Sequence, residues 1–569
     1  MVILCRPGMV IHTILLLFSS GLPAQVGACG PPIVIPITNV SLPNGQSRRG
    51  LHLEIGNPKQ DFAFLPQWAK NNTYVYSSTS PQCPANTSNG ACITYRGGLF
   101  NTDASTSKAN KSVDEAGADP SDILNGLRGN FVATNSTLMV FLTDELRLNA
   151  NTSLRNYPIG LPNDDIGQQQ AEPQAILGLG QNSTILSALK SAGQIASRSY
   201  GFFYGLTGLT TSAQLDGSLV LGGYDRAKTF GPNVTSPLTD VAQCRSQMMV
   251  TVTGISLNWP NRTNSQMFSR EGDAFRACLI PDYPLVMSLP SEVFQRINSN
   301  FDASFVGRSN GINFWGVAYD SAGGAPYDGD LTARIEVAGQ SLDVHIPNDQ
   351  LVLPDITIAD DGALAANYSK QVVMLDALSA ETENLLPIIG RSFLSSAYVF
   401  VNQDQGTFTL WSANASTATD VVTVDEEGAQ VSNSCAVNNT SPINYDAGAT
   451  SGSAGSVLSK GAIAGIAVGG VSLLGLFGFV MFRCLKRRTG TGVTLPDKDS
   501  SVYAHYQHSG TAKEPQEMPG YRELQEIDGA DRGRFELGNS ALRYEMAADA
   551  PLSELSGVKT PRTETRIDP

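Results

Sequence analysis

Short apolar runs, broken by Gly, Pro and Asn, make up most of the chain between residues 31 and 415. Runs with the residue types of strands are found at residues 138–142, 217–221, 249–253 and 398–401. Helical periodicity is confined to two short segments, residues 183–192 and 291–298, and Pro290 with Ser291 forms a start signal for the second. The pattern predicts a large all-β domain.

Two apolar stretches lie outside this domain. Residues 14–18 follow Arg6 and precede small residues, which predicts a signal peptide of residues 1–24, with cleavage as late as Ala28 as the alternative. Residues 461–482 carry no charge and are long enough to cross a bilayer as a helix. Basic residues crowd behind this segment, so the positive-inside bias places the C-terminus in the cytosol. We therefore expect a single-pass type I protein of the plasma membrane, with a vacuolar or other endomembrane location as the alternative.

The segments beside the predicted span are polar. Residues 416–460 are rich in Ser, Thr, Asn, Gly and Ala, which predicts a flexible stalk. Residues 483–569 lack a sustained period and predict a disordered cytoplasmic tail. Within the span, Gly461, Gly465 and Gly469 recur every fourth residue and place small residues on one helix face. This spacing predicts a homodimer contact, although it also fits a generic small-residue face.

Charge and glycosylation signals narrow the class of protein. The net charge of −14 leaves no basic surface to neutralise phosphates, so nucleic acid is excluded as a partner. Thirteen Asn-x-Ser/Thr sequons precede the predicted span and none follows it, which predicts an extracellular glycoprotein domain. The sequon residues are Asn39, Asn71, Asn86, Asn110, Asn135, Asn151, Asn182, Asn233, Asn261, Asn367, Asn414, Asn438 and Asn439.

Residues 55–62, Ile-Gly-Asn-Pro-Lys-Gln-Asp-Phe, resemble the opening strands of the pepsin-like aspartic peptidases. Further segments resemble later landmarks of that family, and they occur in the family's order at residues 175–180, 217–225, 289–294 and 387–394. The resemblance implies a bilobal fold over residues 31–415, with one lobe over about 31–225 and the other over about 226–415.

The catalytic residues of the family are replaced in this chain. Counted in the family's register, the two aspartates fall on Gln67 and Pro281. Asp282 is one residue out of register, and we expect it to be a solvated loop residue. The family's mechanism needs two carboxylates that share a proton around one water, and glutamine has no titratable proton near working pH. The flap tyrosine of the family also lacks a counterpart in residues 128–131.

The resemblance therefore implies a membrane-anchored, catalytically inactive member of the fungal type. We expect a pseudoprotease that binds a peptide, glycan or protein ligand, without a cofactor or metal. Trp68 and Tyr283 are the candidate cleft residues, and Trp68 would either offer an aromatic surface or fill the emptied site. The alternative is an aspartic endopeptidase with an atypical site, in which Asp282 is the fallback carboxylate.

A second catalytic motif has to be weighed. Residues 307–311 read Gly-Arg-Ser-Asn-Gly, as in the nucleophile elbow of serine hydrolases. That elbow requires a following helix, whereas the next residues have a strand pattern, so we interpret the segment as a surface turn.

The eight cysteines suit an oxidising compartment. Cys83 and Cys92 are close enough in sequence to clip a small loop. Cys244 and Cys278 bracket the hairpin that leads into the second catalytic loop, where the family commonly has a disulfide. Cys29 and Cys435 remain as a pair that would tie the ends of the domain.

Overall fold

The structure is a computed structural model that describes residues 30–84, 86–122, 139–163, 173–321, 324–378, 385–431 and 443–445. The predicted signal peptide, the flap segment, the span with its glycines, the tail and the Cys29–Cys435 pair lie outside these ranges. Within them, no helix is both long enough and apolar enough to cross a membrane. The span at residues 461–482 therefore stays a prediction.

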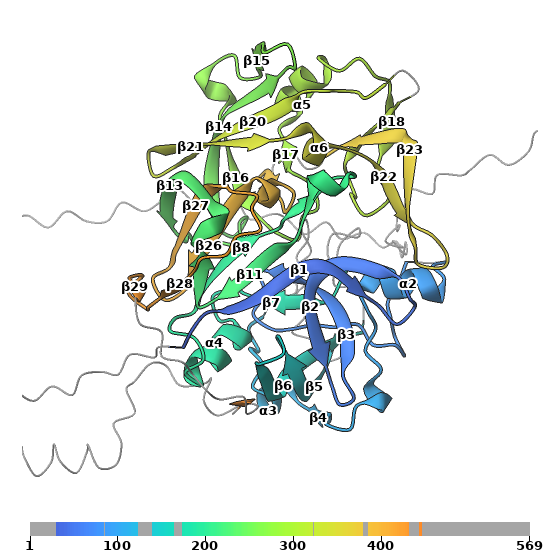
Figure 1. Ribbon diagram of the computed structural model, residues 1–569, viewed down its shortest axis with the longest axis vertical. Coiled ribbons are helices and arrows are strands. Elements are labelled where there is room, and N and C mark those ends of the chain that lie inside the picture. The colour runs from blue at the N-terminus through green and yellow to red at the C-terminus, as the bar shows by residue number, and fades with distance from the viewer. Residues whose placement is uncertain are drawn as a thin grey trace, which may run out of the picture. The chain divides into compact units, whose positions relative to one another are not determined.

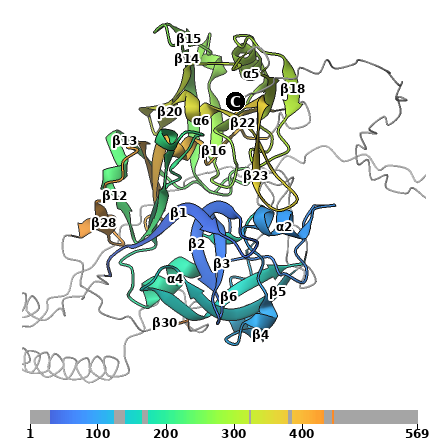
Figure 2. The ribbon, with the colours of Figure 1, turned by 45° about the vertical axis from the view of Figure 1, so that its right-hand side comes forward.

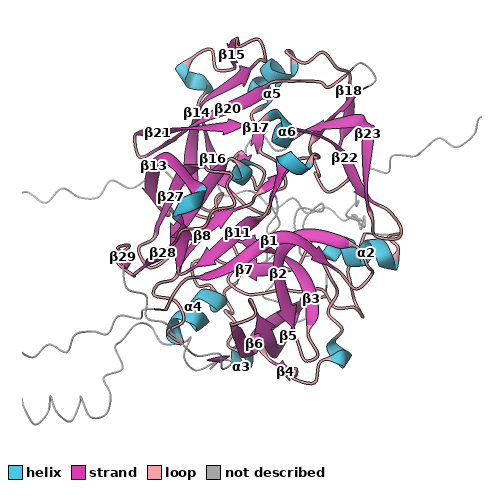
Figure 3. Ribbon diagram, viewed as in Figure 1, coloured by secondary structure: helices cyan, strands magenta, loops and turns pink. Residues whose placement is uncertain are grey.

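Strands dominate the described residues and helices are short, as Figure 3 shows, so the all-β prediction is confirmed. The predicted helices are present as α4 (Thr184–Ser191) and α5 (Ser291–Asn298). Ser183 caps α4 by accepting a hydrogen bond from the Leu186 amide. The remaining helices are α2 (Asn89–Arg96), α3 (Val113–Ala116) and α6 (Asn348–Leu351).

The largest sheet has thirteen strands and draws on both halves of the sequence. Its main path runs β13-β27-β26-β8-β11-β1-β2-β5-β6-β30, so strands from the end of the domain lie beside strands from its beginning (Figure 1). Its members are β1 (Ile33–Ser41), β2 (Ser47–Ile55), β3 (Gln60–Gln67), β4 (Ala109–Lys111), β5 (Met139–Arg147), β6 (Ser153–Pro162), β7 (Ile176–Gly178), β8 (Ser199–Phe203), β11 (Gly217–Leu221), β13 (Thr229–Pro237), β26 (Ala397–Asn402), β27 (Thr407–Ala413) and β30 (Ile443–Asn444).

Two further sheets belong to the second half alone. The eight-stranded sheet contains β14 (Met249–Asn258), β15 (Asn264–Gln266), β16 (Phe275–Leu279), β17 (Met287–Leu289), β20 (Asp330–Val337), β21 (Gln340–Ile346), β24 (Leu375–Ala377) and β25 (Ile388–Ile389). The four-stranded sheet contains β18 (Phe305–Arg308), β19 (Val317–Asp320), β22 (Val352–Ile358) and β23 (Leu364–Val373). A short pair is formed by β9 (Leu206–Thr207) and β10 (Gln214–Leu215).

Each half contains one parallel strand pair that ends at a glycine. In the first half β3 runs parallel to β7, with Gln67 opposite Gly178. In the second half β16 runs parallel to β25, which Gly390 follows. A Cβ on either glycine would lie 2.4 Å from a main-chain oxygen, that of Asn72 or of Tyr283, so both positions require glycine. In each half, a glycine at the end of a parallel strand pair therefore lets a neighbouring loop approach the backbone closely.

A hairpin of the second half reaches across to the first. The turn between β22 and β23 contacts the start of α2, as both ribbon views show (Figures 1 and 2). Ser88 Oγ donates to the Asp360 carbonyl in the turn of this hairpin. We call this hairpin, residues 352–373, the strap. It holds the two halves together at a point separate from the shared sheet.

The folded domain extends beyond residue 415. β28 (Val421–Val424) pairs with β12 (Gly223–Asp225) and with β29 (Gln430–Val431), and Val424 is buried. β30 pairs with β6, and the Tyr445 hydroxyl donates to the Gly117 carbonyl. A stalk that begins at residue 416 is therefore wrong for these segments. β28 has the sequence Val-Val-Thr-Val, whose residue types suit a strand, although the segment around it is polar.

Both local cysteine pairs are joined. Cys83 and Cys92 form one disulfide, and Cys244 and Cys278 form the other. The second bridge links the turn before β14 to the strand β16, next to the second catalytic-type loop. These two pairings are confirmed.

Removing the Cys244–Cys278 bridge is expected to destabilise the protein more than removing Cys83–Cys92. The sequence separations are 34 and 9 residues, and on the chain-entropy account these loops correspond to about 4 and about 2.5 kcal/mol of unfolding free energy. Urea unfolding of the two paired Cys→Ala variants under non-reducing conditions measures the difference. Equal losses, or the opposite order, would contradict the chain-entropy explanation.

Candidate functional site

Gln67 closes β3 at the first position where the family has an aspartate. The side chain is buried, and its Oε1 accepts a hydrogen bond from the Ala69 amide at 2.9 Å. Its main-chain oxygen accepts from the Leu179 amide at 2.8 Å, across the parallel pair with β7. The side chain at this position is a neutral amide bonded within its own loop, and it can act neither as a general acid nor as a general base near neutral pH.

Trp68 fills space in the core. It is 2% exposed, and its ring contacts Phe202 edge-on at 5.9 Å and Tyr200 at 6.3 Å between centroids. Both partners belong to β8 in the large sheet. One side of the indole also borders a separate polar recess that includes Asp122 and Arg245. Two roles were expected for Trp68, an aromatic binding surface or a residue that fills the core. Its packing supports the second role.

The second loop places no carboxylate in register with Gln67. Leu279 lies opposite Ile389, and the Ile280 amide donates to the Ile389 carbonyl at 2.8 Å. This register sets Ile280 across from Gly390, in the place that Gln67 takes across from Gly178. Pro281 is one residue further along the loop.

Asp282 is buried, so the prediction of a solvated loop aspartate is wrong. It is 1% exposed, and neither carboxylate oxygen has a hydrogen-bond partner among the described residues. Its main-chain oxygen accepts from Arg391 Nη1 at 2.7 Å, which pulls the Pro-rich loop inward. The carboxylate lines none of the cavities described below. In this position it has no access to a substrate.

Tyr283 is a core residue rather than a cleft residue. Its ring stacks on Trp315 at 5.7 Å, and its hydroxyl donates to Asp376 Oδ2 at 3.1 Å. Asp376 also forms an ion pair with Arg308. The aromatic residues that follow Gln67 and Asp282 thus belong to the interior.

The Gly-x-Ser-x-Gly segment is partly exposed: Asn310 is exposed, Gly307, Arg308 and Gly311 are half-buried, and Ser309 alone is buried. Ser309 follows β18 and is fully buried, and its hydroxyl donates to Asp355 Oδ1 at 2.6 Å. Asp355 is paired with Lys370 at 2.8 Å. The serine serves a structural hydrogen bond and lies beside no histidine in the described part of the chain.

A cavity of about 210 Å³ lies where the two halves meet. A second cavity of about 190 Å³ adjoins it and shares Arg48 and Ile312 with it. We call the first the junction cavity. Its lining residues are Asn39, Arg48, Arg49, Gln174, Tyr204, Leu206, Thr207, Gln214, Pro284, Ile312, Asn313, Leu353, Ile356, Leu364, Arg391 and Ser392.

Three arginines reach the junction cavity from two distant parts of the chain. Arg48 and Arg49 come from β2, and Arg391 follows Gly390 in the second half. The guanidinium carbons of Arg49 and Arg391 lie 5.3 and 5.9 Å from the centre of the Tyr204 ring. Tyr204 therefore gathers two of the cations at one wall.

Arg48 is the most enclosed of the three. It is 4% exposed, and its Nε donates to Gln174 Oε1 at 3.1 Å. Gln174 is fixed in turn by its own donation to the Ala63 carbonyl at 2.9 Å. Burial, and next the nearby charge of Arg391, lower the pKa of the Arg48 guanidinium to about 10, so it remains a cation at neutral pH.

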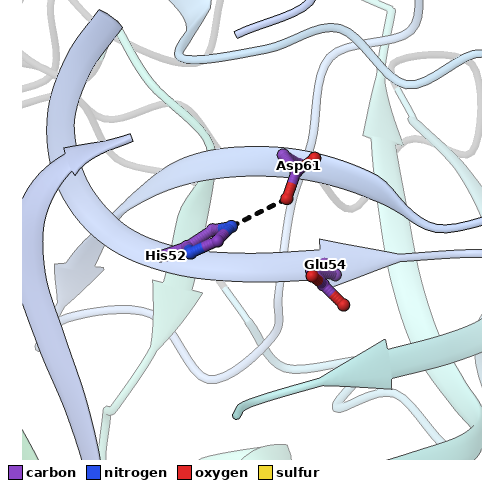
Figure 4. A group of neighbouring side chains, drawn as sticks. All are labelled: His52, Glu54 and Asp61. Carbon is purple, nitrogen blue, oxygen red and sulfur yellow. Dashed lines mark hydrogen bonds and ion pairs between the residues drawn. The ribbon is translucent and has the colours of Figure 1, made fainter. Parts of the chain in front are cut away.

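His52, Glu54 and Asp61 form a group with metal-ligand character on the outer face of β2 and β3 (Figure 4). His52 Nε2 lies 2.7 Å from Asp61 Oδ1, and about two fifths of each side chain is exposed. Glu54 is already engaged by Lys59 at 2.5 Å and by Arg147 at 3.9 Å. We interpret the group as surface ion pairing across two strands.

Ten of the thirteen sequons lie in the described residues. Nine of their asparagines are exposed, as an attached glycan requires. Asn71 is half-buried, and its Nδ2 donates to Asp119 Oδ2 at 2.8 Å. Asn39 lies on the rim of the junction cavity. Asn135, Asn438 and Asn439 lie outside the described residues.

None of the three arginines was predicted from the sequence to be a site residue. A usable signal existed at Arg391, because a cation directly after the apolar Ile-Ile-Gly strand end interrupts a segment that is otherwise buried. No known protein family matches the chain, and no curated protein matches it in sequence.

Proposed function

We propose that the protein is a cell-surface pseudoprotease: a membrane-anchored glycoprotein with a pepsin-like bilobal ectodomain that holds a peptide ligand without cleaving it. The main support is the state of the two catalytic-type loops. Gln67 presents an amide that its own loop occupies, and Ile280 stands in the equivalent register of the second half. Asp282, the nearest carboxylate, is sealed in the core.

The repeated parallel pairs support the bilobal part of this proposal. Each half passes a loop beneath a glycine that tolerates no side chain, and the two loops sit at the ends of β3 and β16. Pepsin-like enzymes are expected to place their two aspartates in such loops. The uncharged segment 461–482 and the exposed sequons support the membrane-anchored part.

The junction cavity supports the binding part. It lies between the halves, as a groove for an extended chain would, and apolar residues such as Ile312 and Leu353 line it beside polar donors. Small-molecule and peptide sites are typically mostly apolar with a few placed polar groups. Binding and turnover are separable, because a groove makes its contacts without the two carboxylates.

The test uses full-length protein purified in mild detergent and immobilised. A mixed peptide library is passed over it, and the captured peptides are eluted and sequenced by mass spectrometry. We expect specific peptides to be retained at full length. Ile312→Trp, which narrows both cavities, is expected to reduce capture about tenfold, a loss of about 1.4 kcal/mol.

Phe230→Trp is the matched control, because Phe230 is 68% exposed and lines neither cavity. Its capture should equal that of the unaltered protein. Recovery of cut fragments would favour the endopeptidase alternative. Failure to capture any peptide would reject the proposed function.

A further inference from the structure

The junction cavity concentrates positive charge without a carboxylate to balance it. Three arginines line it, and none of the other described residues that line it is Asp or Glu. This is unusual in a chain whose net charge is −14, where acidic residues outnumber basic ones. Like charges gathered in a poorly solvated space repel one another, so the arrangement is less stable empty than with an anion bound.

The hydrogen bonds of the arginines leave donors for a ligand. Arg48 uses its Nε on Gln174, and Arg391 uses one Nη on the Asp282 carbonyl. Arg49 is more committed, because its Nη2 donates to the carbonyls of Tyr204 and Leu215. Arg48 and Arg391 therefore have guanidinium N–H groups that no described residue accepts from. Guanidinium groups with two such donors bind carboxylates in a planar, paired geometry.

Asn313 supplies an independent sign of a missing partner. Its side chain is 8% exposed and lines the cavity, and its buried Nδ2 has no acceptor among the described residues. A buried amide donor without a partner costs free energy, which an acceptor on a bound ligand would recover.

We propose that the junction cavity is a carboxylate-binding site, in which Arg48 and Arg391 hold the carboxylate of a peptide ligand and Asn313 donates a hydrogen bond to it. This inference rests on the proposed function and specifies its ligand. The carboxylate belongs either to the C-terminus of the peptide or to an acidic side chain, since the recognising chemistry is the same.

The remaining walls favour a carboxylate that carries an apolar arm over a bare inorganic anion. Leu206, Ile312, Leu353 and Ile356 line the same space. Its volume of about 210 Å³ exceeds the roughly 150 Å³ cavity that accommodates benzene, so a carboxylate and a short hydrocarbon arm fit together. An inorganic phosphate would use the same donors but would leave these apolar walls without a contact.

Four otherwise identical N-acetylated pentapeptides test the proposal, selected from the sequences captured by the full-length protein. They combine a free or amidated C-terminus with Glu or Gln at the penultimate position, and affinities are measured by fluorescence polarisation. We expect at least one carboxylate-bearing peptide to bind ten or more times as tightly as the doubly neutral peptide. If binding requires the free C-terminus, the carboxylate is the terminal one. If binding requires the penultimate Glu, it is the side-chain carboxylate.

Two substitutions distinguish this site from other surfaces. Arg48→Gln should weaken the carboxylate peptide at least tenfold and leave the doubly neutral peptide unchanged. Asn313→Asp places a carboxylate inside the cavity, so it should weaken the same peptide at least tenfold and raise the unfolding temperature. Asn264→Asp is the control, because the exposed Asn264 lines neither cavity and should change neither quantity.

The outcomes separate the two proposals. If all four peptides bind equally, the carboxylate site is rejected while the binding function stands. If inorganic phosphate binds as tightly as the peptides, the site serves a free anion and the inference is also rejected. Retention of no peptide at all rejects the binding function itself.

Discussion

Purified full-length protein is expected to leave peptide substrates intact between about pH 3 and pH 7. General acid–base catalysis contributes about 10² to 10⁴ in rate for each group that acts, and here the pair is missing from both loops. The Gln67 side-chain oxygen accepts a hydrogen bond from the Ala69 main-chain amide, and the Asp282 carboxylate is buried in the protein interior. Mass spectrometry of a peptide library after prolonged incubation measures the residual cleavage.

The matched comparison is Asp282→Asn, which should behave like the unaltered protein. Because the Asp282 oxygens have no contact with solvent, changing one of them to an amide removes no catalytic group. Pepstatin-sensitive cleavage that disappears in Asp282→Asn would overturn the pseudoprotease assignment. It would also require the second loop to rearrange from the position described here.

Trp68→Ala should cost about 3–5 kcal/mol of unfolding free energy, the loss typical of emptying a buried aromatic site. The indole is 2% exposed and packs on Tyr200 and Phe202 of β8, so truncation leaves a cavity under the shared sheet. Chemical unfolding followed by circular dichroism measures the loss.

Trp68→Phe keeps a ring in the site and should lose less than half as much. Phe230→Ala, at an exposed position, should change stability by no more than about 0.5 kcal/mol. If Trp68→Ala were as stable as Phe230→Ala, the indole would have no structural role, and an open aromatic binding surface would become the better interpretation.

Strand and helix positions were largely predictable because local pattern and turn residues specify them. The segment at residues 217–221 matches β11, and residues 291–298 match α5. β28 has a local strand signal in its Val-Val-Thr-Val sequence, but the polar composition of the surrounding segment outweighed it in the prediction, and β29 has only two residues. β28 pairs with β12, a partner about two hundred residues earlier that no local window contains, and β29 pairs with β28.

For the candidate site, the sequence predicted only that a pair of carboxylates is absent, and not which residues line the cavity. The resemblance to pepsin-like peptidases pointed to Gln67 and Pro281, and it implied only that carboxylates are absent there. Whether Asp282 is solvated depends on Arg391, more than a hundred residues away, which draws the loop inward. The junction cavity depends on the same kind of long-range contact. Arg48 and Arg391 are unrelated in sequence and meet only because the halves do.

The position of β8 in the large sheet has a consequence for biosynthesis. β8 pairs on one side with β11, which follows it closely, and on the other with β26, made about two hundred residues later. At about 5–20 residues per second, roughly 10–40 s separate the synthesis of the two strands. Throughout that interval the nascent chain carries an unpaired strand edge with the sequence Ser-Tyr-Gly-Phe-Phe, a template for aggregation. Chains truncated before Ala397 should therefore depend on chaperones to stay unaggregated.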